Sequence, residues 1–202
     1  MGKTARRLIA LVAVAAVAVF AYRFYQARRS QQAGILSESI EHQGDAWTVD
    51  YTARIPAPAT AVFGAIEHIE NSHSDSIRGV KVLSQNGNRK VVELTMNGPA
   101  NQSVVTKIAF EYFPQDHRIT YRTLDSPMFD TSAEYRLTDE GASTLINFHQ
   151  TATSSKPVNL PDAIVREVIR SVFIGQLDGI KQSLNLASST VDDEADKDPD
   201  EP

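Results

Sequence analysis

The strongest constraint on the fold is a run of six strand-like segments that turn signals divide into three successive hairpins. Residues 80–85 and 90–96 flank the turn Asn86-Gly87-Asn88, and Asn-Gly is the strongest short hairpin signal. The second and third pairs are 104–113 with 118–125 and 129–138 with 143–153, each joined by a short polar turn. Because consecutive hairpins pair antiparallel strands, this part of the chain predicts an antiparallel meander.

One further strand and a short helix precede the meander. Residues 46–55, AWTVDYTARI, alternate strictly between apolar and polar side chains, which is typical of a strand with one face exposed to water. Pro56 and Pro58 end that strand, and Pro58 suits the first turn of a helix that we expect to reach about Ile69. The sheet is therefore expected to contain seven strands.

A long helix follows the meander. Pro161 opens the segment PDAIVREVIRSVFIGQLDGIKQSLN, whose apolar residues recur at helical spacing and predict a stripe that covers one face of the sheet. Gly175 and Gly179 each cost about 1 kcal/mol relative to alanine in a helix. Either close packing on the sheet or room for a ligand would explain them.

The N-terminal end carries an uninterrupted apolar stretch, residues 8–22. At 1.5 Å per residue it reaches roughly 22 Å, and about 27 Å if it extends to Tyr25 while Arg23 snorkels, against a hydrocarbon core of roughly 30 Å. We predict an uncleaved membrane anchor, residues 8–25, within an N-terminal hydrophobic segment, residues 1–25, that has basic flanks. A cleaved secretory signal or a buried helix are the alternatives. Since a short N-terminal tail usually stays cytoplasmic, the domain is expected on the extracytoplasmic side, the periplasm in a Gram-negative bacterium.

The charges and the composition divide the rest of the chain. Residues 26–44 are predicted to be a polar spacer, 45–187 the folded domain, and 188–202 an acidic disordered tail. The mildly acidic body argues against a nucleic-acid partner. The absence of cysteine excludes disulfides, thiolate metal sites and cysteine nucleophiles.

The element order of strand, helix, six strands and long helix carries a family resemblance. Together with IPAPATAVFGAIEHIE, residues 55–70, it resembles the START-like (SRPBCC) superfamily of polyketide cyclases, dehydrases and lipid-transport proteins. The resemblance covers roughly residues 46–185. It implies an α+β helix-grip fold, in which a curved seven-stranded antiparallel sheet wraps around the C-terminal helix and encloses a deep cavity.

The resemblance also implies a hydrophobic small-molecule ligand, and alternation along the strands suggests which side chains surround it. The predicted lining is apolar with a few phenol groups, which suits a lipid, quinone, sterol or polyketide-like molecule. Thr131 and Gln150 are also expected to point inward, where they could hydrogen-bond a ligand or each other. The predicted ligand-cavity residues are Tyr51, Phe110, Tyr121, Tyr135, Phe148, Val168, Val172 and Gly175.

Catalytic and metal-binding patterns are weak in this sequence. His68 and His73 are five residues apart and do not match the HExxH spacing, His42 falls in the predicted spacer, and His149 alternates onto the outer face. We therefore predict no catalytic residue, no metal and no cofactor, and leave the oligomeric state open. The leading hypothesis is membrane-tethered binding or transport of a hydrophobic molecule. The alternatives are a cyclase, aromatase or hydrolase that uses the same cavity, and a non-catalytic partner-binding module.

Overall fold

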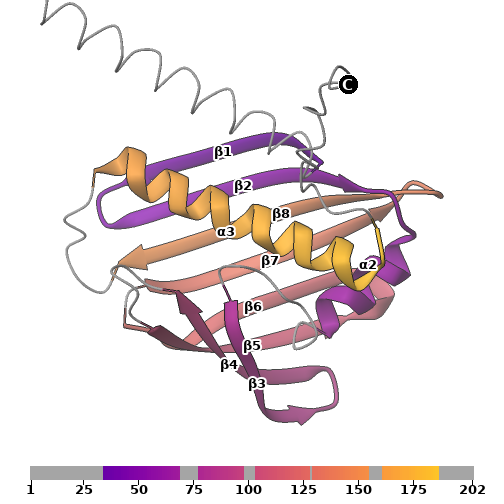
Figure 1. Ribbon diagram of the computed structural model, residues 1–202, viewed down its shortest axis with the longest axis horizontal. Coiled ribbons are helices and arrows are strands. Elements are labelled where there is room, and N and C mark those ends of the chain that lie inside the picture. Colours follow the sequence, from indigo (N-terminus) through magenta and orange to yellow (C-terminus); the bar gives the residue numbers. More distant parts are fainter. Residues whose placement is uncertain (1–33, 69–76, 98–102, 128, 155–160, 187–202) are drawn as a thin grey trace, which may run out of the picture.

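The computed structural model of the protein describes residues 34–68, 77–97, 103–127, 129–154 and 161–186. These residues form an eight-stranded sheet in the order β1-β2-β8-β7-β6-β5-β4-β3, in which neighbouring strands are antiparallel (Figure 1). The strands are β1 Ile35–Gln43, β2 Ala46–Ile55, β3 Ile77–Asn86, β4 Arg89–Asn97, β5 Ser103–Phe113, β6 Arg118–Asp125, β7 Phe129–Asp139 and β8 Thr144–Ser154. The predicted meander is confirmed, and its three hairpins are β3–β4, β5–β6 and β7–β8.

Two helices complete the described fold. The long helix α3, Asp162–Ser183, runs along the face of the sheet, in front of β2, β8 and β7, and the sheet curves around it (Figure 1). The shorter helix α2, Ala59–Glu67, lies beyond one end of α3. This is the α+β helix-grip arrangement that the sequence predicts, with eight strands in place of seven.

The additional strand β1 corrects the prediction of a polar spacer for residues 26–44, which is wrong from Ile35 to Gln43. β1 pairs along its length with β2 and forms the edge of the sheet. Only one of its side chains, Ile40, is buried, so its hydrophobic pattern is too sparse to be recognised as a strand. A signal does exist in the two-residue connection Gly44-Asp45, where Gly44 adopts a φ of 67°, because such a Gly-Asp pair is typical of tight hairpins.

β1 is attached to α3 as well as to β2. Glu38 forms an ion pair with Arg170, and Arg166 donates a hydrogen bond to the Ile40 carbonyl. His42 Nδ1 lies 3.0 Å from Asp162 Oδ2. The His42 ring also stacks on Trp47 with 4.0 Å between the ring centroids. His42 is exposed, as expected, but it belongs to strand β1 and not to a spacer.

The helix α2 is held to the sheet near both of its ends. Before it, the buried Thr144 hydroxyl donates a 2.6 Å hydrogen bond to the Ala57 carbonyl. At its C-terminal end, Lys90 Nζ donates a 2.6 Å hydrogen bond to the Glu67 carbonyl, although the Lys90 side chain is only 1% exposed. A lysine side chain at the carbonyl end of a helix stabilises the helix, and here Lys90 also covers the core at the end of α2.

The predicted membrane anchor and acidic tail lie outside the described residues. None of the helices in the described ranges is long and apolar enough to cross a bilayer. The anchor, residues 8–25, and the tail, residues 188–202, therefore stay predictions.

The attachment of β1 leads to a stability prediction. The Glu38 and Arg170 side chains are each 26% exposed, so replacing Arg170 with Met leaves a poorly hydrated carboxylate without its partner. We expect Arg170→Met to lower the free energy of unfolding by about 1–2 kcal/mol, measured by urea denaturation. The control is Lys107→Met, whose pair with Asp125 is mostly exposed and should contribute less than about 0.5 kcal/mol. Equal losses for the two variants would contradict a structural role for the β1–α3 contact.

Candidate functional site

The centre of the inner face of the sheet is filled by a row of aromatic rings. Phe173 of α3 stacks on Tyr51 of β2 at 4.1 Å and on Phe148 of β8 at 5.1 Å between ring centroids. The row then continues from Phe148 through Tyr135 of β7 and Tyr121 of β6 to Phe110 of β5, at 4.7, 6.3 and 5.3 Å. Five of the predicted ligand-cavity residues therefore share one face, as their alternation predicts.

Three of these rings are almost completely buried in the core. A side chain that lines an empty cavity keeps surface that water can reach, but Tyr51, Phe110 and Phe148 are only 2–4% exposed. The ring of Phe173, 2% exposed itself, occupies the space between the helix and β2 and β8. The ring of Phe173 therefore fills the space between α3 and these two strands at this point.

The inner face becomes accessible toward one end of the strands. Positions near the α2 end, such as Ile55, Ile119 and Ile146, are fully buried. At the opposite end, where β8 leads toward the start of α3, several inward-facing side chains of β4 to β8 are partly exposed, whereas Trp47 and Ala152 stay buried. We call this region the open end, and it comprises Met96, Val104, Thr123, Phe129, Thr131 and Gln150.

One edge of α3 carries apolar side chains toward the open end. Val172 lies one turn before Gln176, whose side chain reaches the inner face, and Val168 lies one turn earlier. Val168 is 55% exposed and Val172 is 38% exposed, while Gly175 is half-buried. These three predicted residues are not part of the aromatic row, so the structure separates the eight candidates into a packed group and an accessible group.

A cluster of four neutral polar side chains connects the aromatic row to the open end. The Tyr121 hydroxyl donates a 2.9 Å hydrogen bond to Gln150 Oε1, and the Tyr135 hydroxyl donates one of the same length to Gln176 Oε1. The inward orientation predicted for Gln150 is confirmed. Gln176 is a residue that the sequence analysis missed, because a single glutamine beside an apolar helical stripe carries no distinguishing pattern.

Burial determines the ionisation of these phenols. Desolvation raises the pKa of Tyr121 above its usual value, and the neighbouring Gln176 amide offsets only part of the rise. Desolvation also raises the pKa of Tyr135 well above 10, and the nearby Tyr121 adds to the effect. The pKa of Tyr51 is raised as well, mainly by burial and further by the nearby Glu38 carboxylate. All three phenols are therefore neutral at physiological pH.

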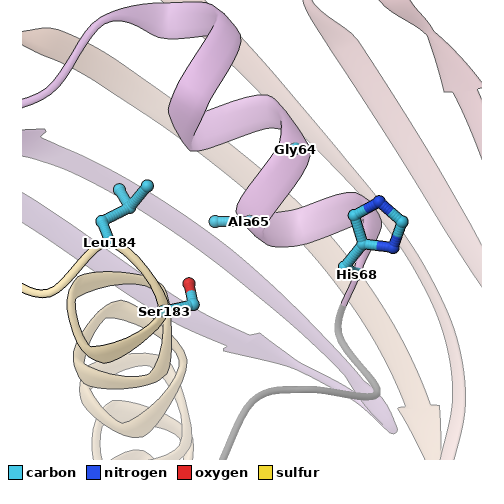
Figure 2. Close-up of a pocket in the computed structure, with 5 residues that line it drawn as sticks. All are labelled: Gly64, Ala65, His68, Ser183 and Leu184. Carbon is cyan, nitrogen blue, oxygen red and sulfur yellow. The ribbon is translucent and has the colours of Figure 1, made fainter.

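A separate pocket of about 330 Å³ lies at the other end of the domain, between α2 and the end of α3 (Figure 2). Ala65 of α2 points toward the end of α3 across it, and a Cβ added at Gly64 would meet open space (Figure 2). The Ser183 hydroxyl donates its hydrogen bond to the Ile180 carbonyl within α3. The lining residues are Gly64, Ala65, His68, Ser183 and Leu184.

The histidines of the described ranges do not form a catalytic or metal-binding group. His149 Nδ1 lies 2.8 Å from Asp50 Oδ1, and both side chains are more than half exposed, which confirms the surface position predicted for His149. No group of three or more His, Asp or Glu side chains that could hold a metal occurs within those ranges. His73 lies outside them.

Comparisons with known proteins support the fold and the resemblance. The structure is similar to the Zhui aromatase/cyclase from Streptomyces sp. R1128, with 18% identity, a TM-score of 0.59, and coverage of 69% of this chain and 94% of that chain. It is also similar to a START superfamily protein from Mycobacterium smegmatis, with 17% identity, a TM-score of 0.55, and coverage of 67% and 97% respectively. A third similar structure is Ara h 8.0201, with 15% identity, a TM-score of 0.56, and coverage of 69% and 99%. At these identities the similarity establishes a shared fold.

The sequence comparisons identify the family. No curated protein sequence matches the chain. The family described as polyketide cyclase / dehydrase and lipid transport matches residues 46–185, which span β2 to the end of α3 and confirm the START-like resemblance. Since this match covers well over half of the sequence, the chain belongs to the polyketide cyclase / dehydrase and lipid transport family.

Proposed function

We propose that the domain binds a hydrophobic small molecule at the open end of the sheet, beside the apolar edge of α3. The observation that carries this proposal is the change from packed to accessible apolar surface along one face of the sheet. Val168 and Val172 border that surface, and the Tyr121–Gln150 and Tyr135–Gln176 pairs form its inner limit. An apolar surface with a few fixed polar groups is typical of small-molecule sites.

The expected affinity is consistent with a binding protein. Each 100 Å² of apolar surface removed from water contributes roughly 2.5 kcal/mol, so a ligand that covers a few hundred Å² of this face gains several kcal/mol before the cost of association. The free-energy cost of association offsets part of this gain, so we expect a moderate affinity and reversible binding. Reversible binding is what a carrier of a bilayer-dissolved molecule requires.

The ionisation of the tyrosines favours binding over base catalysis. A neutral phenol donates a hydrogen bond, but a phenol whose pKa is raised by burial cannot accept a proton at neutral pH. Cyclase, aromatase or hydrolase activity in the same place remains the alternative. Such an activity would use the Tyr121 and Tyr135 hydroxyls as hydrogen-bond donors to a substrate carbonyl and not as bases.

A membrane tether would complement this function. The described chain begins at Gly34, whose carbonyl accepts a 2.8 Å hydrogen bond from the Arg54 amide. The eight residues between the predicted anchor, residues 8–25, and Gly34 span at most about 30 Å, which would keep the domain close to ligand dissolved in the bilayer.

Deletion of residues 2–25 should move the protein from the membrane fraction to the supernatant. A fused periplasmic reporter enzyme should be active if the domain is extracytoplasmic, and an unchanged fractionation would contradict the tether.

Two substitutions that add bulk at opposite ends of α3 test the position of the ligand. Val172→Phe places a ring at the open end, and we expect it to weaken binding of the neutral fluorescent probe N-phenyl-1-naphthylamine at least tenfold. Gly64→Leu instead fills the pocket between α2 and α3, where its Cβ meets open space, and should leave the affinity unchanged. The measurement is fluorescence titration, with thermal unfolding as the control for folding.

The reverse pattern would contradict the proposed position. If Gly64→Leu abolished probe binding while Val172→Phe retained it, the ligand site would be the pocket between α2 and α3. If wild-type protein did not bind the probe, the proposal of hydrophobic ligand binding itself would be wrong.

A further inference from the structure

We propose that the ligand is a neutral molecule with a carbonyl oxygen, and that the side-chain amide of Gln150 is the group that recognises this oxygen. This inference rests on the proposed function and names the ligand class for the same site. It is drawn from the hydrogen bonds of the four-residue polar cluster, the absence of charged side chains among the described residues of the open end, and the position of the cluster next to that end.

The hydrogen bond from Tyr121 fixes the orientation of the Gln150 amide. The Tyr121 hydroxyl donates to Gln150 Oε1 at 2.9 Å, which directs the amide nitrogen away from the phenol. In the part of the chain that the structure describes, Gln150 makes no other side-chain hydrogen bond. The Gln150 side chain is half-buried, and a ligand that covers it would remove the amide nitrogen from water. A covered N–H without an acceptor costs about 1–3 kcal/mol, so the site selects a ligand that supplies an acceptor oxygen.

Tyr135 and Gln176 support this arrangement from the helix side. The Tyr135 hydroxyl donates to Gln176 Oε1 at 2.9 Å, and the Gln176 amide lies beside the Tyr121 hydroxyl, close enough to influence its ionisation. Gln176 therefore fixes the Tyr135 hydroxyl, and the Tyr135 ring lies 6.3 Å from the ring of Tyr121, the residue that positions Gln150. Because both tyrosines are nearly fully buried, at 8% and 4% exposure, their rings cannot readily reorient and the cluster is preorganised.

The surroundings of the cluster favour a neutral ligand over an acid. The cluster consists of two phenols and two amides, and the six residues of the open end include no charged side chain. A carboxylate covered by these groups would lose its hydration without gaining a cation. A ketone, quinone or ester oxygen accepts hydrogen bonds from the amide without that penalty.

A matched pair of probes separates carbonyl recognition from simple apolar binding. We would measure displacement of N-phenyl-1-naphthylamine by 9-fluorenone and by fluorene, which share one rigid ring system and differ by a C=O in place of CH₂. The full chain is used in lipid nanodiscs, with protein-free nanodiscs as the blank. The readout is the ratio of the two dissociation constants in wild type and in each variant, because the change in this ratio cancels the different partitioning of the probes from water.

Gln150→Leu removes the amide and should reduce the relative preference for fluorenone about fivefold, the effect of losing one hydrogen bond worth about 1 kcal/mol. Gln150→Glu keeps an acceptor for the Tyr121 hydroxyl but offers no N–H, so it should reduce the preference at least as much. The control Gln182→Leu makes the same kind of change at an exposed position near the end of α3 and should leave the ratio unaltered.

Four results distinguish the inference about carbonyl recognition from the proposed function on which it rests. A reduced ratio in both Gln150 variants, with a wild-type ratio in Gln182→Leu, supports carbonyl recognition. An unchanged ratio in both Gln150 variants, while both probes still bind, overturns the inference and leaves hydrophobic binding intact. Failure of both probes to displace N-phenyl-1-naphthylamine from wild type overturns the inference, whereas failure of N-phenyl-1-naphthylamine itself to bind overturns the proposed function as well.

Discussion

The position of α3 depends on the insertion of one aromatic ring, Phe173, between the helix and the sheet. Its ring stacks on Tyr51 and Phe148, which come from the neighbouring strands β2 and β8. Burying side chains of this size contributes roughly 2–3 kcal/mol each, and aromatic contact adds about 1 kcal/mol per pair. The same ring packs over the centre of the inner face, and the ligand site that we propose lies beyond it, at the open end.

The two edges of α3 have different chemistry, and this difference organises the domain. Arg166 and Arg170 on one edge bind β1 through a backbone carbonyl and an ion pair. Val168 and Val172, on the other edge, are exposed toward the open end. β1 precedes residue 46, where the family match begins, and it holds the polar edge of the helix. The apolar edge is left available for a ligand.

Local patterns predict most of the fold but only part of the site. Alternation places Tyr51, Tyr121 and Phe148 on the inner face correctly, because a side-chain period of two is a property of any strand. β1 escapes detection because an edge strand buries too little to need a hydrophobic pattern.

The space left for a ligand depends on how closely α3 packs on the sheet. Tertiary packing determines this, and no local sequence pattern reveals it. In the sequence Phe173 is one more apolar residue in a helical stripe, but in the fold its ring fills the space between α3 and strands β2 and β8. Gln176 likewise gains meaning only from the 2.9 Å hydrogen bond that the fold creates with Tyr135. For the same reason the eight candidate lining residues separate into packed and accessible groups only once the helix is placed on the sheet.

The most direct test of the account is a crystal structure of the protein with a bromine-substituted alkyl ketone, with anomalous scattering used to locate the bromine. We predict a bromine peak beside Val168 and Val172, with the ketone oxygen within hydrogen-bond distance of the Gln150 amide. A peak between α2 and the end of α3, near Gly64 and Leu184, would contradict the claim that the open end of the sheet is the binding site.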